Sequence, residues 1–304
     1  MIIHGNQRYI EAPFSSEQEL EDVVTANFEL IFGPDSIFLP KALIKSAEGV
    51  GTIPDGFAVD LGAKTWYVVE AELASHGTWR HIAPQVAKQV IAAEQPETRA
   101  KLREMVIRMV KSDEGVRERF ADQGVAEIDI PRHIEGILSR PPVVAIPIDN
   151  VRRDLEEWAN TLRSEVKLWK IRKLVEFRDE RNVIYEIPDE FRPSLDTANE
   201  SSSRQTSYDV SILDLVEAGR LNIGQDLTMT YSPRNGSSAV YRAVIQDDGS
   251  LLVDGKQFSS PSFAALYGIQ AAGSSRATVN GWRVWKTDAG QSLFELRAAH
   301  LGES

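Results

Sequence analysis

The sequence contains no cysteine among its 304 residues. This absence excludes disulfide bonds and thiolate metal sites, and it agrees with a reducing compartment. Long apolar runs are also missing, since no stretch approaches the roughly 20 residues that a membrane-spanning helix needs. The first residues lack the basic region followed by a hydrophobic one that marks a secretory signal. We therefore expect a cytoplasmic protein with no membrane partner.

Positive charge is scarce as well. The chain has 34 Lys and Arg against 45 Asp and Glu, which gives a formal net charge of −11. Binding to polyanions relies on clustered Lys and Arg, so this balance argues against a general nucleic-acid binder. Any contact with DNA must use a local basic patch or metal ions that neutralise acidic groups. The length is enough for about two domains of ordinary size.

A predicted β-hairpin at residues 53–73 carries the candidate site. Its first strand bears Asp55, residues 62–64 form the turn, and Glu70 and Glu72 lie at the end of the second strand, which is expected from Thr65 to Leu73. Because side chains alternate across a strand, Glu70 and Glu72 point to one face, and Asp55 lies across the hairpin from them. Three converging carboxylates suit a hard cation such as Mg²⁺ or Mn²⁺. The alternative is that these acids are simply solvated at a strand end.

The order of these acids resembles the core of the PD-(D/E)XK nucleases: Pro54-Asp55, a hairpin, and then Glu70-Ala71-Glu72. The resemblance implies an α/β fold of the restriction-endonuclease type, a mixed sheet flanked by helices. It also implies that Asp55 and Glu70 hold the metal. The last position of the motif is normally Lys and here is Glu72, which some restriction enzymes of the superfamily tolerate. This departure affects the expected mechanism more than the expected fold.

A helix is predicted before the hairpin, with Ser15 or Ser16 as its N-cap and Gly33-Pro34 as its stop. Acids in its first turn oppose the helix dipole, and Glu21 lies beside its apolar stripe. In the nuclease superfamily a Glu on the first helix often reaches the metal cluster, so the resemblance implies this role for Glu21. The alternative is a solvated helix residue.

A second helix follows the hairpin. It carries His81, Gln85, Lys88 and Gln89 three or four residues apart, so they can share one face. The segment resembles the second helix of the nuclease core, and the resemblance implies that this face lines the site, with Gln85 as the first candidate, and can supply the cation that Glu72 does not. The alternative is that these are surface helix residues. His76 and His81 are not spaced like a zinc pair with further ligands nearby, so we expect no zinc site.

The remaining elements are predicted from apolar periodicity. Residues 192–208 contain almost no apolar side chains and are predicted to form a flexible linker. The chain therefore divides into a nuclease-like domain, 1–191, and a smaller α+β domain, 209–304. In the first domain we expect strands at 37–44, 142–148, 166–175 and 182–187 and helices at 97–120 and 154–162. In the second we expect helices at 211–219 and 259–267 and strands at 226–231, 239–245, 251–253 and 293–297.

The second domain resembles the RAMA domain, which is associated with restriction enzymes and adenine methyltransferases. The resemblance rests on 215–219, Gly249, Asp254-Gly255, 260–265 and 280–285. It implies a DNA-reading module, with double-stranded DNA and a modified base as candidate ligands.

The local chemistry of this domain permits DNA binding. Hydroxyls of Ser260 and Ser262 at a helix start can bind a phosphate, Asn280 can read a base edge, and Trp282 can stack, with Arg283 beside it. The alternative is that Trp282 and Trp285 are core residues and the serines are helix caps.

Together these patterns predict a Mg²⁺- or Mn²⁺-dependent DNA endonuclease of the restriction type. Asp55 and Glu70 would hold the metal, and Glu72 would orient or deprotonate the attacking water with support from Glu21 and Gln85. Because cutting both strands commonly needs two sites, this interpretation also predicts a homodimer. The alternative is a catalytically silent scaffold that binds DNA or a protein partner. The missing Lys and the net charge of −11 favour that alternative, whereas the intact acids disfavour it.

Overall fold

The structure is a computed structural model that describes residues 1–187, 210–232, 238–274, 276 and 278–302. The chain separates into two compact units, one of residues 1–121 with 125–190 and one of residues 191–304 with 122–124. The predicted linker at 192–208 lies outside the described residues, so its bounds stay a prediction. In the described parts of the chain no helix is long and apolar enough to cross a membrane.

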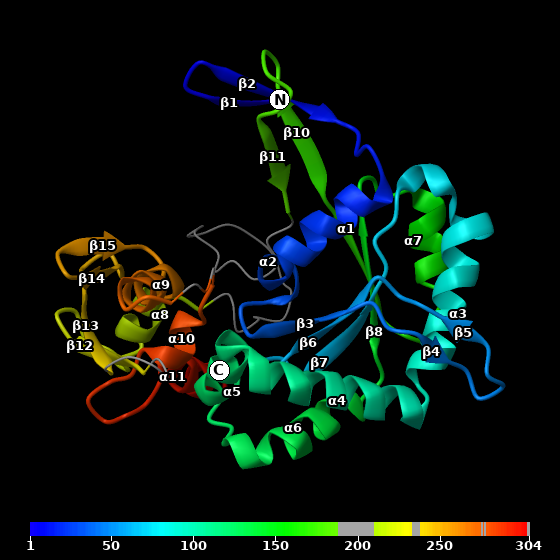
Figure 1. The fold of residues 1–304 in the computed structure, drawn as a ribbon. Helices are drawn as coiled ribbons and strands as arrows, with labels where there is room; N and C mark the ends of the chain where they lie inside the picture. Colours follow the sequence, from blue (N-terminus) through cyan, green and yellow to red (C-terminus); the bar gives the residue numbers. More distant parts are fainter. Residues whose placement is uncertain (188–209, 233–237, 275, 277, 303–304) are drawn as a thin grey trace. The chain divides into compact units, whose positions relative to one another are not determined.

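A five-stranded mixed sheet forms the centre of the first unit (Figure 1). Its strands, in spatial order, are β3 (Ser36–Pro40), β6 (Gly56–Asp60), β7 (Thr65–Val69), β8 (Val143–Ile148) and β9 (Val166–Lys170). Strand β6 pairs antiparallel with β3 and with β7, whereas β8 pairs parallel with β7 and with β9. The predicted hairpin is confirmed: Gly56 pairs with Val69, and Lys64 takes a positive φ of 53° in the turn. The first unit is therefore a mixed α/β structure.

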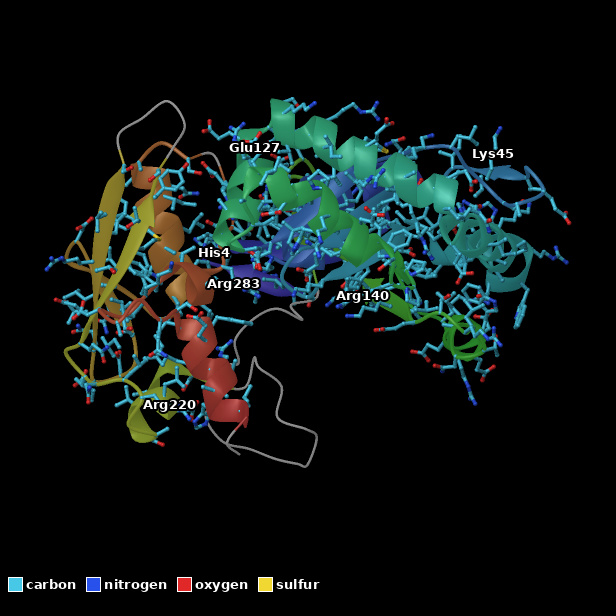
Figure 2. The ribbon with its side chains drawn as sticks, turned by 90° about the horizontal axis from the view of Figure 1, so that it is seen from below. His4, Lys45, Glu127, Arg140, Arg220 and Arg283 are labelled. Carbon is cyan, nitrogen blue, oxygen red and sulfur yellow. The ribbon has the colours of Figure 1, made fainter. Side chains whose placement is uncertain are left out.

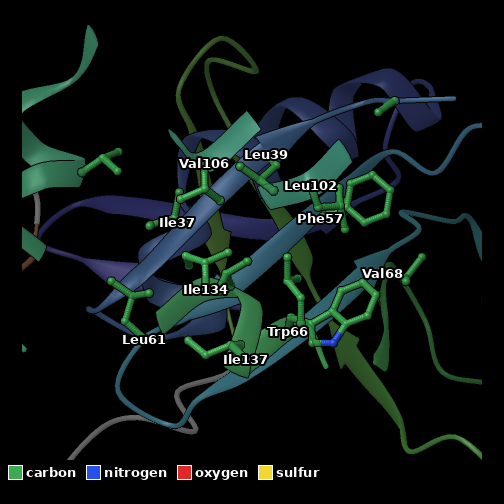
Figure 3. Packing of buried hydrophobic residues seen from close by; sticks show 14 of the residues in the cluster. Ile37, Leu39, Phe57, Leu61, Trp66, Val68, Leu102, Val106, Ile134 and Ile137 are labelled. Carbon is green, nitrogen blue, oxygen red and sulfur yellow. The ribbon is translucent and has the colours of Figure 1, made fainter. Parts of the chain in front are cut away.

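Helices cover both faces of this sheet because its buried strands are apolar on both sides. On one face lie α1 (Glu17–Ala26) and α2 (Phe28–Phe32), which pack on residues such as Val69 and Ala71. On the other face lie α3 (Ala83–Ala93), α4 (Pro96–Ser112), α5 (Glu114–Asp122), α6 (Ile130–Leu138) and α7 (Arg153–Ala159). Figure 3 shows Val106 and Ile134 of α4 and α6 among Ile37, Leu39 and Phe57 of the sheet. Each such fully buried Leu, Ile or Phe contributes about 1.5–3 kcal/mol.

Several elements of the first unit differ from the predictions. The helix expected at 97–120 is divided at Asp113 into α4 and α5. The helix expected to continue to Gly33 is interrupted at Asn27, whose side-chain amide donates to the Val23 carbonyl at 2.8 Å and caps α1. The strand expected at 37–44 ends at Pro40, and β4 (Ile44–Lys45) pairs instead with β5 (Gly51–Thr52). The strand expected at 166–175 is two strands, β9 and β10 (Arg172–Glu176), which belong to different sheets.

A second, antiparallel sheet in this unit has the order β1-β2-β10-β11. It contains β1 (Ile2–His4), β2 (Gln7–Ala12) and β11 (Val183–Glu186) besides β10. The hairpin β1–β2 and helix α6 were not predicted. Charged side chains cover the outside of the unit, and Lys45, Glu127 and Arg140 are exposed (Figure 2).

The C-terminal unit contains the antiparallel sheet β12 (Asp226–Tyr231), β13 (Ala239–Ile245), β14 (Leu251–Val253) and β15 (Lys256–Phe258). Its helices are α8 (Ile212–Glu217), α9 (Pro261–Ala271), α10 (Gly281–Val284) and α11 (Leu293–Gly302). The strands predicted at 226–231, 239–245 and 251–253 are confirmed, whereas the strand predicted at 293–297 is wrong. That segment is helical because Ser292 and Glu295 form a reciprocal cap: the Ser292 N–H donates to Glu295 at 2.7 Å and the Glu295 N–H to Ser292 at 3.2 Å.

Candidate functional site

Glu70 and Glu72 lie just beyond the end of β7, in an extended segment that β8 holds in place. The Glu70 N–H donates to the Ala145 carbonyl at 2.9 Å, and the Glu72 N–H donates to the Pro147 carbonyl at 3.0 Å. The alternation of side chains therefore continues, so both acids leave the sheet on the same face and Ala71 enters the core on the other. Glu70 is 2% exposed and Glu72 is 1% exposed. Burial this complete is unusual for carboxylates.

Asp55 lies immediately before β6, across the hairpin from the two glutamates. Its Oδ2 accepts a hydrogen bond from the Ala71 N–H at 2.9 Å, which fixes the carboxylate against the segment between Glu70 and Glu72. Its Oδ1 accepts from the Lys41 ammonium at 2.9 Å. The structure thus brings together the three acids that the hairpin pattern predicted.

Lys41 is the cation of this cluster, and sequence reasoning did not identify it. Strand β3 pairs with β6 so that its last residue, Pro40, lies opposite the first residue of β6, Gly56. Lys41, which follows β3, and Asp55, which precedes β6, therefore become neighbours. The Lys41 ammonium also lies 2.5 Å from Glu21 Oε2, which joins Glu21 to the cluster through this lysine. Hydrogen bonds to Glu21 and Asp55 outweigh partial burial and raise the pKa of Lys41 above its usual range. It therefore stays charged.

Two glutamines of α3 bind Glu70. Gln85 donates to Glu70 Oε1, and Gln89 donates to Glu70 Oε2 at 2.6 Å. Of the polar residues predicted to share one face of this helix, Gln85 and Gln89 contact Glu70, whereas Lys88 is exposed to solvent. The buried Gln89 Oε1 has no hydrogen-bond partner within the described residues.

Glu72 is surrounded by a different set of groups. Its Oε2 lies 3.2 Å from His76 Nδ1, and its Oε1 lies 3.5 Å from His81 Nε2. The same His76 Nδ1 lies 2.5 Å from Glu17 Oε1. The neighbours of Glu72 are therefore imidazoles, which the short helical turns η1 (Ala74–His76) and η2 (Thr78–Ile82) supply. The sequence pattern had indicated no role for Glu17 or His76.

Burial and mutual repulsion dominate the electrostatics of these acids. Burial first, and then the Asp55 carboxylate, raise the pKa of Glu70 to about 8, although Gln89 and Gln85 oppose the shift. Burial first, and then Glu17, Glu70 and Asp55, raise the pKa of Glu72 to about 9. Burial also raises the pKa of Asp55, against the opposing effect of Lys41. Near neutral pH the cluster therefore binds protons unless additional positive charge replaces them.

The donor set at Asp55 and Glu70 fits a hard divalent cation. Carboxylate oxygens are the ligands that Mg²⁺ prefers, and the orphaned amide oxygen of Gln89 beside Glu70 is a further oxygen donor. A divalent charge would also remove the repulsion that raises the pKa values of these acids. Residues Asp55 and Glu70 would hold the ion once Lys41 and Gln85 release the oxygens that they now bind.

In the C-terminal unit the candidate hydroxyls bind the backbone of their own fold. Ser260 caps α9 and accepts from the Ser262 N–H at 3.2 Å, and Ser262 accepts from the Gly281 N–H at 3.1 Å. A Cβ atom on Gly281 would lie 2.1 Å from the Pro261 carbonyl, so only glycine allows this contact. The start of α9 is thus covered by α10. The phosphate site predicted at this helix start stays a prediction, and both of its serine hydroxyls already accept hydrogen bonds from backbone N–H groups.

The tryptophans of this unit lie in its hydrophobic core. Trp285 is fully buried and donates from its indole nitrogen to the Pro261 carbonyl at 3.0 Å. Trp282 is 7% exposed, and the guanidinium carbon of Arg297 lies 3.2 Å from its ring centroid. Arg283 lies over the Phe294 ring at 3.9 Å. Stacking of a base on Trp282 would need Arg297 to move, so the geometry favours the core role, and Asn280, which is partly buried, is left as a predicted contact.

The comparison with protein families agrees with the resemblance of the C-terminal unit. Residues 193–303 match the family model RAMA, described as Restriction Enzyme Adenine Methylase Associated. No curated protein and no solved structure matches the chain. The buried contacts among α9, α10 and Trp285 lie within the matched residues. The C-terminal part of this chain is therefore a RAMA domain, which links the protein to restriction-modification systems.

Proposed function

We propose that this protein is a metal-dependent DNA endonuclease of the restriction type. Its N-terminal unit would cut double-stranded DNA, and its RAMA domain would select the DNA, with a modified base as the candidate signal. The observation that carries the proposal is the convergence of Asp55, Glu70 and Glu72 at the end of the β6–β7 hairpin, where the two glutamates are buried and all three acids have raised pKa values. The order of these acids resembles the PD-(D/E)XK core.

In this proposal Asp55 and Glu70 hold Mg²⁺ or Mn²⁺, which when bound polarises the phosphate and lowers the pKa of a water ligand. Glu72, once ionised, accepts the proton of the attacking water, and its raised pKa makes it a stronger base than an exposed carboxylate. Lys41 supplies the positive charge that the motif normally carries at the position of Glu72. Gln85 and Gln89 orient Glu70, and Glu21 positions Lys41.

The RAMA domain contributes selection of the target in this proposal. A tether at 192–208 would let one unit hold the other near bound DNA and raise its effective concentration there. Because the net charge is −11, we expect the affinity for DNA to depend on divalent ions and on the RAMA domain together. Cutting of both strands would need two active sites, and therefore a homodimer.

The test is cleavage of plasmids that differ only in base modification: none, adenine-methylated, cytosine-methylated or hydroxymethylated. Each is incubated with Mg²⁺ or Mn²⁺ and the full-length protein, Asp55→Asn, or the control Asp22→Asn, whose carboxylate is exposed on α1. We expect cleavage of one modified plasmid, lost in Asp55→Asn and retained in Asp22→Asn. Equal cleavage of all plasmids would contradict selection by the RAMA domain, and no cleavage would contradict the nuclease.

A catalytically silent scaffold is the second candidate. One observation favours it: Lys41, Gln85 and Gln89 already bind oxygens of Asp55 and Glu70. Thermal melting with and without Mg²⁺ separates the two functions, since an ion that binds only the folded state at about 100 times its Kd stabilises it by about 2.7 kcal/mol. A nuclease should be stabilised by Mg²⁺ in the wild type and not in Asp55→Asn. A scaffold should show no such difference.

A further inference from the structure

Four metal-binding side chains gather beside the nuclease-like acids. Glu17, Glu72, His76 and His81 each offer one ligand atom, and these atoms all lie within 4.8 Å of one another. The two imidazole rings meet edge to face with centroids 5.0 Å apart. The group combines two imidazoles with two carboxylates, so its chemistry differs from that of the purely oxygen-donating pair Asp55 and Glu70.

The backbone after β7 is shaped to bring the two histidines to the same point. His76 ends the turn η1, and Gly77 follows with a φ of +78°, a conformation that glycine adopts without strain. The chain then forms a π-helical turn at Thr78–Ile82, in which the His81 N–H donates to the Gly77 carbonyl at 3.2 Å. π-helical turns are rare in proteins, and those that occur are often found at functional sites. This reversal returns His81 to Glu72, and α1 adds Glu17 from a distant part of the sequence.

We propose that Glu17, Glu72, His76 and His81 bind one divalent transition-metal ion of the Zn²⁺ class. Two imidazole nitrogens and two carboxylate oxygens form a four-ligand set that suits such ions, whereas Mg²⁺ prefers oxygen ligands alone. The sequence predicted no zinc site because His76 and His81 have no further ligands nearby along the chain. Their further ligands come from α1 and from the end of the hairpin, which spacing along the chain does not reveal.

The hydrogen bonds of the cluster support a metal. His76 Nδ1 faces both Glu17 at 2.5 Å and Glu72 at 3.2 Å, yet an imidazole nitrogen carries at most one proton to share between them. Glu72 is almost completely buried, so its charge is not solvated by water. A divalent ion would balance the two carboxylates and would use the lone pairs of neutral imidazoles. The competing arrangement is a metal-free network in which shared protons join these four side chains.

This inference goes beyond the proposed nuclease and does not depend on it, although Glu72 belongs to both sites. If both sites exist, Glu72 lies between a hard-cation site and a transition-metal site. If the chain cleaves no DNA, the histidine site still stands as a metal-binding site of the N-terminal unit.

Co²⁺ is the probe for this site, because four-coordinate Co²⁺ with nitrogen and oxygen ligands absorbs visible light and therefore reports its own coordination. The untagged full-length protein is freed of metal with a chelator and titrated with Co²⁺. We expect one Co²⁺ per chain with a visible absorption band that Zn²⁺ removes by competition and Mg²⁺ does not. His76→Ala and His81→Ala should each raise the Kd for Co²⁺ by more than about tenfold, since loss of even an outer-shell partner costs about 10–100-fold.

The matched control is His4→Ala, which removes an exposed histidine on β1 (Figure 2) and should leave the Kd unchanged. Metal-free melting curves check that the variants fold, and His81 is 46% exposed, so its removal should cost little stability. Asp55→Asn should keep Co²⁺ binding while it loses stabilisation by Mg²⁺, which separates this inference from the nuclease proposal. Absence of the Co²⁺ band, or equal binding by His76→Ala and the wild type, would overturn the site and leave the metal-free network.

Discussion

The candidate residues of the two units lie in opposite kinds of environment. In the N-terminal unit Glu70 and Glu72 are buried where burial and neighbouring acids oppose their ionisation. In the RAMA domain Ser262 and Trp285 are bonded to the backbone of their own fold. The first arrangement costs stability and indicates a ligand, whereas the second contributes stability. A sequence motif can therefore place buried acids together in one unit and make a folding contact in the other.

The RAMA motif shows why a signature need not be a binding site. Gly281 lets α10 contact the first turn of α9, and Trp285 reaches the Pro261 carbonyl from the same helix end. Both residues belong to the segment that carries the family resemblance. Their positions follow from packing alone, so a match to this segment does not by itself identify a binding site.

The largest effect should come from Glu70→Gln. If Glu70 holds the catalytic metal, cleavage should fall by at least about a hundredfold, or about 2.7 kcal/mol, because metal ions contribute several kcal/mol to such reactions. Without divalent ions the melting temperature should stay equal or rise, because the change removes a buried carboxyl group whose ionisation is costly. Plasmid cleavage and thermal melting measure the two effects.

The control for Glu70→Gln is Glu104→Gln, which changes an exposed carboxylate on α4. A strong loss of stability with cleavage retained would break the comparison, because Glu70 would then be a structural residue like those of the RAMA domain.

The next largest effect should come from Gly281→Ala. Its Cβ would lie 2.1 Å from the Pro261 backbone, which cannot move away as a flexible side chain can. We expect the RAMA domain to lose about 3 kcal/mol of stability, the upper end of the usual cost of overpacking. Calorimetry of the full chain should show one transition at a lower temperature and the other unchanged. Gly302→Ala is the matched control, since a Cβ there meets no atom within 4 Å.

A pH series should give an effect of definite sign. The pKa of Glu70 is about 8 and that of Glu72 about 9 in the folded chain, against 4.5 for an ordinary glutamate. The folded state therefore binds more protons than the unfolded state between these values, so this contribution to stability is complete below about pH 4.5 and is lost as the pH rises to about 9. In a chelator we expect the melting temperature to fall over this window, and less steeply in the double variant Glu70→Gln, Glu72→Gln. If the melting temperature fell equally steeply with pH in both proteins, the raised pKa values of Glu70 and Glu72 would be refuted.

The smallest effect should come from Ser292→Ala, which removes the N-cap of α11. The cost should be about 1 kcal/mol, and only the RAMA domain should be affected. Ser259→Ala, an exposed serine of the same domain, serves as the control and should change nothing measurable. If Ser292→Ala were also neutral, the reciprocal cap with Glu295 would not explain why this segment is helical.

Local patterns in the sequence predicted several features correctly. Alternation of side chains located Glu70 and Glu72 on one face, a turn sequence located the hairpin, and three strands of the RAMA domain were predicted with their observed bounds. Helical spacing put Gln85 and Gln89 on one face of α3, and the resemblance to the nuclease core directed that face to the acids. These features succeed because each depends on residues a few positions apart, where strand and helix periodicity decide the geometry. The cap at Ser292 and Glu295 is a local signal of the same kind, and overlooking it produced the wrong strand at 293–297.

Only the tertiary structure decided which distant groups meet at the candidate site. Lys41 reaches Asp55 because β3 pairs with β6 in one register, and a shift of one residue would turn its side chain to the other face. Glu17 joins His76 because α1 packs near the end of the hairpin. The strand expected at 166–175 divides between two sheets for the same reason. The sequence by itself determined the hairpin, its acids and the RAMA domain, whereas strand register and helix packing, which act between distant residues, determined the cations and imidazoles that surround those acids.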